Sequence, residues 1–98
     1  MTGQFVTSKA GHDKGVLYIV VAEEGDFVYL SDGRLRKPDR PKKKRRKHIQ
    51  PINAEADEDL KARLLAGETV RPEEVRYAIR QFESNRTNKT LEEMYVEK

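Results

Sequence analysis

The longest apolar run in the chain is VLYIVVA, at residues 16–22. Successive side chains of a β-strand point to opposite faces of the sheet, so a strand that is apolar throughout has to be buried on both faces. The middle of a curled sheet offers such a position. The run is also far too short to cross a bilayer, for which a helix needs about 20 apolar residues.

Other short strands are expected on either side of this run. The sequence predicts them at QFVTS, FVYLS and HIQPI, residues 4–8, 27–31 and 48–52. Asp32-Gly33 is typical of a two-residue hairpin turn and would lead into a strand at RLRK. Pro38 and Pro41 then interrupt pairing, because proline offers no backbone N–H to a sheet. Four or five short strands within fifty residues predict a small antiparallel barrel, whose closure removes exposed edges.

The hydrophobic period changes after Ile52. Asn53 is a candidate N-cap for a helix whose apolar stripe is Leu60, Leu64 and Leu65, and Gly67 is a natural terminator. The second helix is expected to begin at Pro72. Its apolar positions have the i, i+3, i+4, i+7 spacing of an amphipathic helix: Val75, Ala78, Ile79 and Phe82.

Each helix is expected to be about three turns long, which is too short to persist alone in water, so both must pack on the barrel, on each other or on a partner. The segment from Ser84 onward is polar and weakly periodic. The predicted organisation is therefore a barrel with a basic segment at residues 1–52, a helical extension at 53–83 and a flexible tail at 84–98.

Charge is divided unevenly between the two halves of the chain. Residues 1–50 contain 12 Lys/Arg and 6 Asp/Glu, a net charge of +6, whereas residues 51–98 contain 8 and 11, a net charge of −3. Twelve cations in one half favour a polyanionic partner. There is no cysteine, which excludes disulfides and a thiol nucleophile. We find no signal peptide and expect a monomeric cytoplasmic protein that makes no contact with a membrane.

The region from Val6 to Gly33, VTSKAGHDKGVLYIVVAEEGDFVYLSDG, resembles a KOW motif. It has an apolar strand, two glycines (Gly11 and Gly15) separated by three variable positions, and a second apolar strand with a turn. The following KKKRRKHIQP and the helical extension resemble small bacterial KOW-domain proteins related to the eukaryotic-type large-subunit ribosomal proteins of the KOW class. The resemblance implies an SH3-like barrel of about five strands that binds RNA, often on or near the ribosome.

The loop between the two glycines has a physical interpretation of its own. Glycine permits positive φ and close backbone approach at no steric cost, so Gly11 and Gly15 are interpreted mainly as turn formers. Small residues also let a phosphate approach the backbone, with Lys9, His12 and Lys14 around it.

The Lys/Arg run, six consecutive cations after Pro41, has three interpretations. It could be a nuclear-import string, a solvated charged face, or a strand that contacts the phosphate backbone of RNA. Its position between two expected strands favours RNA contact. If it is extended, alternate side chains point in opposite directions. The candidate RNA-binding residues are Lys9, His12, Lys14, Arg34, Arg36, Lys37, Arg40, Lys42, Lys43, Lys44, Arg45, Arg46, Lys47 and His48.

Tyr18 is the candidate for base stacking, whereas Phe27 or Tyr29 is expected in the core. Arg76 and Arg80 could form a second basic strip, but Glu73 and Glu83 lie three residues from them, which favours local pairing. No cluster of acid, base or metal-ligating residues is found, so no catalysis, cofactor or metal is expected.

We therefore expect a non-catalytic RNA-binding protein, associated with rRNA or the ribosome. The alternative is a module that docks a ribosomal or transcription-complex protein through the barrel or the helices. An apolar helix face that covers the barrel would be structural, whereas an exposed one would favour a protein partner.

Overall fold

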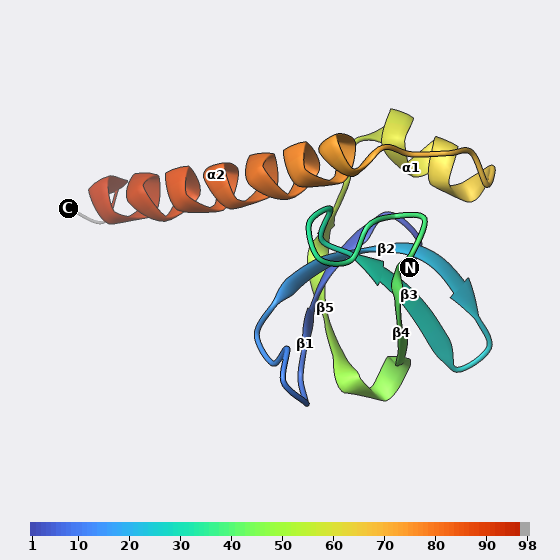
Figure 1. Cartoon of the computed structure of the whole chain (residues 1–98). Coiled ribbons are helices and arrows are strands. Elements are labelled where there is room, and N and C mark those ends of the chain that lie inside the picture. Colours follow the sequence, from blue (N-terminus) through green and yellow to red (C-terminus); the bar gives the residue numbers. More distant parts are fainter. Residues whose placement is uncertain (97–98) are drawn as a thin grey trace.

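The computed structural model describes the backbone of residues 1–96 and the side chains of residues 1–86. Five antiparallel strands form one sheet, and two helices follow it (Figure 1). The strands are β1 (Gln4–Ser8), β2 (Leu17–Glu24), β3 (Phe27–Ser31), β4 (Lys42–Arg45) and β5 (Ile49–Glu55). A short 3-10 helix, η1 (Arg46–His48), joins the last two strands. The predicted mostly-β fold with a C-terminal helical extension is confirmed.

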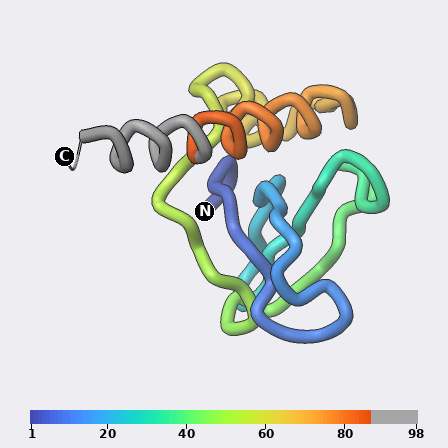
Figure 2. The backbone as a smooth tube through the Cα atoms, turned by 90° about the vertical axis from the view of Figure 1, so that its left-hand side faces the viewer, coloured from blue at the N-terminus to red at the C-terminus, as the bar shows by residue number. Residues whose placement is uncertain are grey.

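The strand order is β4-β3-β2-β1-β5, and every neighbouring pair is antiparallel. The sheet is curled but not closed, so β4 and β5 are its edges and the SH3-like barrel is not confirmed. At one end of the sheet, η1 links these two edge strands. Helix α2 crosses the opposite end (Figures 1 and 2).

The central strand β2 is buried on both faces, as its apolar run predicts. Ile19 and Val21 belong to a hydrophobic cluster shared with Phe5 and the helices. Tyr18 and Val20, which point the opposite way, belong to a second cluster inside the curl of the sheet. The second cluster contains Val6, Tyr18, Val20, Val28, Leu30 and Ile49. Two small hydrophobic cores thus share the strand β2, whose alternate side chains pack into one core or the other.

Helix α1 (Glu58–Leu65) begins later than the sequence predicted. Asn53 does not cap it, because β5 continues to Glu55 and keeps Asn53 in the sheet. The N-cap is Asp57, whose carboxylate accepts a hydrogen bond of 2.8 Å from the backbone N–H of Leu60. The boundary between sheet and extension therefore lies after Glu55 and not at residue 52.

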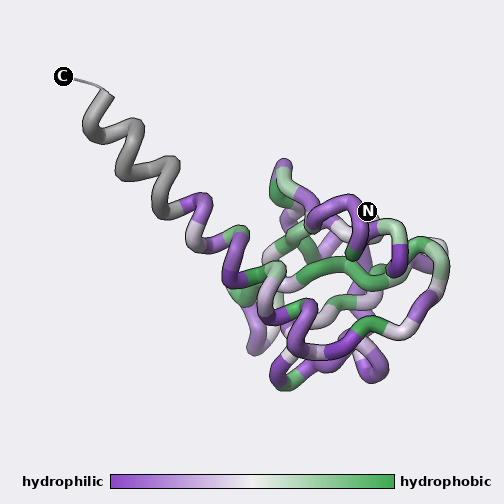
Figure 3. Tube along the Cα trace, turned by 90° about the horizontal axis from the view of Figure 1, so that it is seen from above, coloured by the Kyte–Doolittle hydropathy of each residue, from purple (hydrophilic) through white to green (hydrophobic). Residues whose placement is uncertain are grey.

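Helix α2 (Pro72–Val96) is 25 residues long, not the expected three turns. Neither glycine nor proline occurs after Pro72 to stop it. The tail expected from Ser84 is thus helical through Val96, and its last two residues lie outside the described part of the chain. Figure 3 shows α2 leaving the body of the sheet beyond its first turns. No helix among the described residues is long and apolar enough to span a membrane.

The first turns of α2 cover the sheet. Val75 is fully buried and Ala78 nearly so, in the same cluster as Phe5, while Ile79 and Phe82 pack against that cluster. The rings of Phe5 and Phe82 stack with centroids 4.6 Å apart. The apolar face of α2 is therefore structural along this length.

The connection from β3 to β4 is a loop of residues 32–41 and not the predicted two-residue hairpin. The Oδ1 atom of Asp32 accepts hydrogen bonds from the backbone N–H groups of Arg34 and Arg36, at 2.8 and 3.0 Å. This side-chain turn replaces the pairing that a two-residue hairpin would need, so RLRK is not a strand. The partner strand of β3 is instead the Lys/Arg run.

Candidate nucleic-acid interface

The Lys/Arg run forms β4 and η1, at an edge of the sheet (Figure 1). In β4 the register pairs Lys42 with Leu30 and Lys44 with Val28. Leu30 and Val28 are both fully buried, so this side of β4 faces the interior. Lys43 and Arg45 pair with Tyr29 and Phe27 and are exposed. We call Lys42 and Lys44 the inner row and Lys43 and Arg45 the outer row. The alternation that an extended run predicts is confirmed.

Both lysines of the inner row are held by one carboxylate. The Nζ of Lys44 lies 2.6 Å from Oδ1 of Asp13, and the Nζ of Lys42 lies 2.9 Å from Oδ2. Only 10% of the Lys44 side chain and 11% of the Asp13 side chain are exposed. Lys44 also donates to the backbone carbonyl of Ala10. The inner row thus ties the edge strand to the loop between β1 and β2.

Asp13 also accepts hydrogen bonds of 2.9 Å from the hydroxyls of Ser8 and Tyr18. Burial of the carboxyl raises the pKa of Asp13. The hydrogen bonds from Lys44 and Lys42, with those from Ser8 and Tyr18, outweigh burial and hold this pKa well below its usual range. Asp13 is therefore charged at neutral pH and offsets the two inner cations.

Tyr18 does not fit the predicted stacking role. It is 3% exposed, inside the second hydrophobic cluster. Burial, together with its hydrogen bond to Asp13, raises the pKa of Tyr18 to about 12. Its hydroxyl binds a charged carboxylate and its ring is covered, so no base can stack on it.

The aromatic residue that accompanies the outer row is Phe27, which the sequence analysis placed with Tyr29 as a core candidate. Phe27 is only half-buried, with the Nζ of Lys43 4.3 Å from its ring centroid and the guanidinium carbon of Arg45 5.1 Å from it. The alternation of side chains in FVYLS could have predicted that Phe27 faces outward, because Val28 and Leu30 take the inward positions. An aromatic ring in contact with two exposed cations suits a nucleobase and its phosphates.

The run continues into η1 with a third cation that is neutralised inside the molecule. Arg46 lies 2.7 Å from Glu23 and donates to the carbonyl of Gly25. Hydrogen bonds from the N-terminal ammonium group, then from Arg46, lower the pKa of Glu23 to about 2. Three of the six cations in the run, Lys42, Lys44 and Arg46, therefore have a carboxylate partner. For Lys43, Arg45 and Lys47 no ion pair is found within the described residues.

The glycines of the loop between β1 and β2 act as turn formers, as predicted. Gly11 and Gly15 have φ of +88° and +87°. The N–H of Gly15 bonds the carbonyl of Ser8 at 2.9 Å, within the turn. The N–H of Lys9 bonds the carbonyl of His48 at 2.8 Å, so the loop lies against η1. Lys9, His12 and Lys14 of this loop are exposed, as is Lys47 of η1.

The other predicted cations do not join them. Arg34, Arg36, Lys37 and Arg40 are exposed in the β3–β4 loop, which lies at the end of the sheet near the helices (Figure 1). The candidate residues thus form two groups, connected by the outer row of β4. Leu35, at 92% exposure, lies among the cations of the second group.

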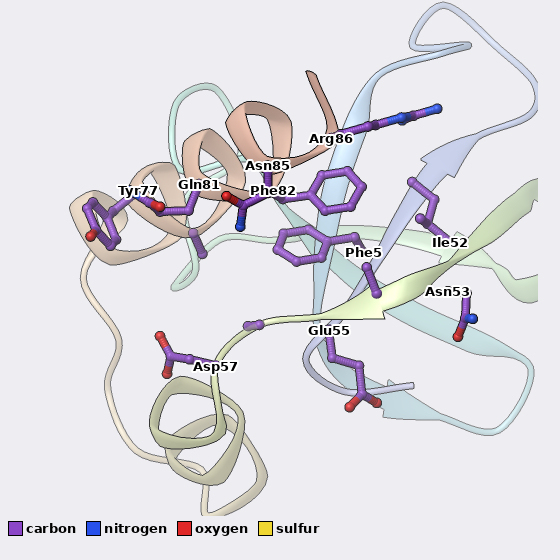
Figure 4. Close-up of a pocket in the computed structure, with 13 residues that line it drawn as sticks. Phe5, Ile52, Asn53, Glu55, Asp57, Tyr77, Gln81, Phe82, Asn85 and Arg86 are labelled. Atoms are coloured by element: carbon purple, nitrogen blue, oxygen red, sulfur yellow. The ribbon is translucent and has the colours of Figure 1, made fainter. Parts of the chain in front are cut away.

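A groove of about 700 Å³ lies between β5 and α2, away from the Lys/Arg run. Its floor is the stacked Phe5–Phe82 pair, and Tyr77, Gln81 and Asn53 lie around it (Figure 4). No cation of the predicted RNA-binding set lines this groove. Among the described residues no group of three His, Cys, Asp or Glu side chains could hold a metal ion.

No protein-family model matches this chain, and no curated protein matches its sequence. The KOW resemblance therefore stays a prediction, and the function has to be argued from the geometry.

Proposed function

We propose that this chain is a non-catalytic RNA-binding protein of the cytoplasm, associated with rRNA or the ribosome, that binds the phosphate backbone with the outer face of β4 and the adjoining β1–β2 loop. The observation that supports the proposal most strongly is the division of the Lys/Arg run. Carboxylates neutralise Lys42, Lys44 and Arg46, whereas Lys43, Arg45 and Lys47 are exposed without an ion pair among the described residues.

This division answers the repulsion between like charges. Six adjacent cations would repel one another in a free strand, which favours disorder. Asp13 and Glu23 remove that repulsion from one side only, so the strand can order while its other side stays positive. An ordered row of cations loses little conformational entropy when it meets a phosphate backbone.

Recognition on this surface is electrostatic, with stacking on Phe27 as its contact to the bases. The exposed cations at this end of the molecule are Lys9, Lys14, Lys43, Arg45 and Lys47. If each neutralises one phosphate, the logarithm of the binding constant falls with the logarithm of salt concentration with a slope of about −3.5 to −4.5.

The test compares two double variants by fluorescence anisotropy on a short RNA across a salt series. Lys43→Gln/Arg45→Gln should weaken binding at least about tenfold and make the slope shallower by about 1.4 to 1.8. Lys61→Gln/Arg71→Gln removes the same charge on and beside α1 and should leave both quantities unchanged. A flat salt response of the wild-type protein, or equal behaviour of the two variants, contradicts the proposal.

A protein-docking function has one observation in its favour, the groove between β5 and α2. Tyr77 borders it with 59% of its surface exposed, and Phe82 forms part of its floor. Purified ribosomal proteins bound by the wild type but not by Tyr77→Ser, with RNA binding intact in both, would favour that function.

A further inference from the structure

Three arginines line a second cavity, at the end of the sheet opposite η1. The cavity has a volume of about 250 Å³ and lies between the start of β2, the β3–β4 loop and α2. Its lining includes Arg34 from the loop and Arg76 and Arg80 from one face of α2. These side chains come from segments more than forty positions apart in the sequence, so only the fold brings them together.

One arginine of the cavity is anchored to the loop, and the other two are exposed. Arg76 is half-buried and donates from Nη1 to the carbonyl of Gly33 at 2.6 Å. That contact uses one of the five N–H donors of its guanidinium group. Arg34 and Arg80 are exposed, and no ion pair is found for any of the three arginines in residues 1–86. The expected pairing of Arg76 with Glu73 is therefore wrong.

Gly33 shows how closely the loop and the helix are fitted at this place. Its φ is +74°, and a Cβ there would lie 2.6 Å from the carbonyl oxygen of Pro72 and 2.8 Å from Cγ of Arg76. Only glycine can occupy this position without moving the helix. The loop is held further by Asp32, which accepts from the N–H groups of Arg34 and Arg36. The backbone that carries Arg34 is thus ordered before any ligand binds.

Charge in the cavity favours an anion. Asp32 and Glu83 also line it, so three arginines and two carboxylates give a net charge of 3 − 2 = +1. Oδ1 of Asp32 already accepts two backbone hydrogen bonds, which reduces its attraction for the arginines. Guanidinium groups match the oxygens of a phosphate in pairs, and a volume of about 250 Å³ admits a phosphate with bound water.

We infer that the cavity lined by Arg34, Arg76 and Arg80 is a second RNA contact, which binds one phosphodiester group of the same RNA that follows the outer row of β4. This inference rests on the proposed function and adds to it. It gives the RNA a contact at each end of the sheet, and it assigns a role to arginines on α2 that the charge run does not include.

The experiment uses the full chain and the same short RNA, with the slope of binding against salt as the readout. Arg34→Gln/Arg80→Gln removes two exposed cations without breaking an ion pair, so thermal unfolding should be unchanged. Binding should weaken about tenfold, and the slope should become shallower by about 0.7 to 0.9, the contribution of one phosphate. The control is Lys61→Gln/Arg71→Gln, which removes the same charge, although from ion pairs with Glu55 and Glu74, and should retain wild-type affinity and slope.

A second measurement identifies the ligand. The Nε–Hε signals of Arg34, Arg76 and Arg80 in NMR spectra should shift on addition of RNA. Shifts with inorganic phosphate or with anionic phospholipid vesicles, but not with RNA, would overturn the inference in favour of a free phosphate or a lipid headgroup.

The two proposals fail separately. Suppose that Lys43→Gln/Arg45→Gln makes the dependence of binding on salt shallower, while Arg34→Gln/Arg80→Gln behaves like its control. Only the second contact is then overturned. If the wild-type protein shows no salt-dependent RNA binding, the proposed function itself fails.

Discussion

The inner and outer rows of β4 have similar side chains in the sequence but opposite surroundings in the fold. Lys42 and Lys44 share the carboxylate of Asp13 and are largely shielded from solvent. Lys43 and Arg45 are exposed, and both cations contact the half-buried ring of Phe27. Since the rows alternate residue by residue, the pleat of one strand pairs one set of charges inside the molecule and leaves the other set exposed.

The difference shows why a count of basic residues overstates a binding surface. The run contains six cations, yet three of them are already paired within the molecule. Pairing anchors the edge strand to the β1–β2 loop and to β2, and so positions the outer row. The inner row should therefore affect RNA binding only through folding, and the outer row should affect folding little.

The sharpest test of the comparison is Asp13→Asn. The substitution keeps the shape of the side chain but leaves Lys44, 10% exposed, without its counter-charge. Removal of one partner from a buried ion pair costs several kcal/mol, so we expect a loss of about 3 kcal/mol in the free energy of unfolding. Urea denaturation measures it.

Asp39→Asn is the matched control, because Asp39 is exposed and no ion pair is found for it in the described part of the chain. It should change the free energy of unfolding by less than about 0.5 kcal/mol. The double variant Asp13→Asn/Lys44→Met should recover part of the loss, since it removes the uncompensated charge. Equal stabilities of the Asp13→Asn and Asp39→Asn variants would show that the inner row is not structural.

The Asp13 carboxylate also predicts that the free energy of unfolding decreases at acid pH. The folded-state pKa of Asp13 lies below its value in the unfolded chain. Its contribution is therefore complete above the unfolded value, near 3.9, and is lost as pH falls toward the folded value. Wild-type stability should decrease below about pH 4, and this decrease should be smaller in Asp13→Asn. Glu23, with a pKa of about 2, contributes to this decrease in stability in both proteins.

Much of the sheet could be predicted because burial on two faces leaves a strong pattern. The apolar run of β2 indicates both clusters, and the glycines of the β1–β2 loop have the positive φ that their spacing suggests. The alternation within the Lys/Arg run was also predictable, because it follows from strand geometry alone.

The partners of the polar groups could not be predicted, because they depend on contacts distant in sequence. Nothing near Lys44 identifies Asp13 as its counter-charge, 31 positions away. The exchange of roles between Tyr18 and Phe27 has the same origin, since a carboxylate inside the curl gives the Tyr18 hydroxyl its partner. At Asp32-Gly33 the turn chemistry was recognised, but Asp32 uses its side chain to hold a loop and not a hairpin.

A smaller effect distinguishes the stacking of a base on Phe27 from the electrostatic attraction of RNA by the outer row. Phe27→Ala should weaken RNA binding about tenfold, because stacking of one base on an aromatic side chain contributes about 1–3 kcal/mol. The salt slope should stay unchanged, since no charge is removed. Tyr77→Ala, which truncates an exposed aromatic residue on α2, serves as the control and should bind like the wild type. A shallower slope for Phe27→Ala would mean that the ring only positions Lys43 and Arg45.

A last test concerns Tyr18, whose hydroxyl shares the Asp13 carboxylate with the inner row. Tyr18→Phe removes one buried hydrogen bond of 2.9 Å to a carboxylate, and we expect a loss of about 1.5 kcal/mol in stability with no change in RNA affinity. Because the pKa of Tyr18 is raised to about 12, this contribution is complete below about pH 10 and is lost as pH rises through 12. In an absorbance titration of the four tyrosines, the step near 12 should disappear from the variant. Weaker RNA binding at unchanged stability would instead place Tyr18 on the outer surface and contradict the division of β4 into two rows.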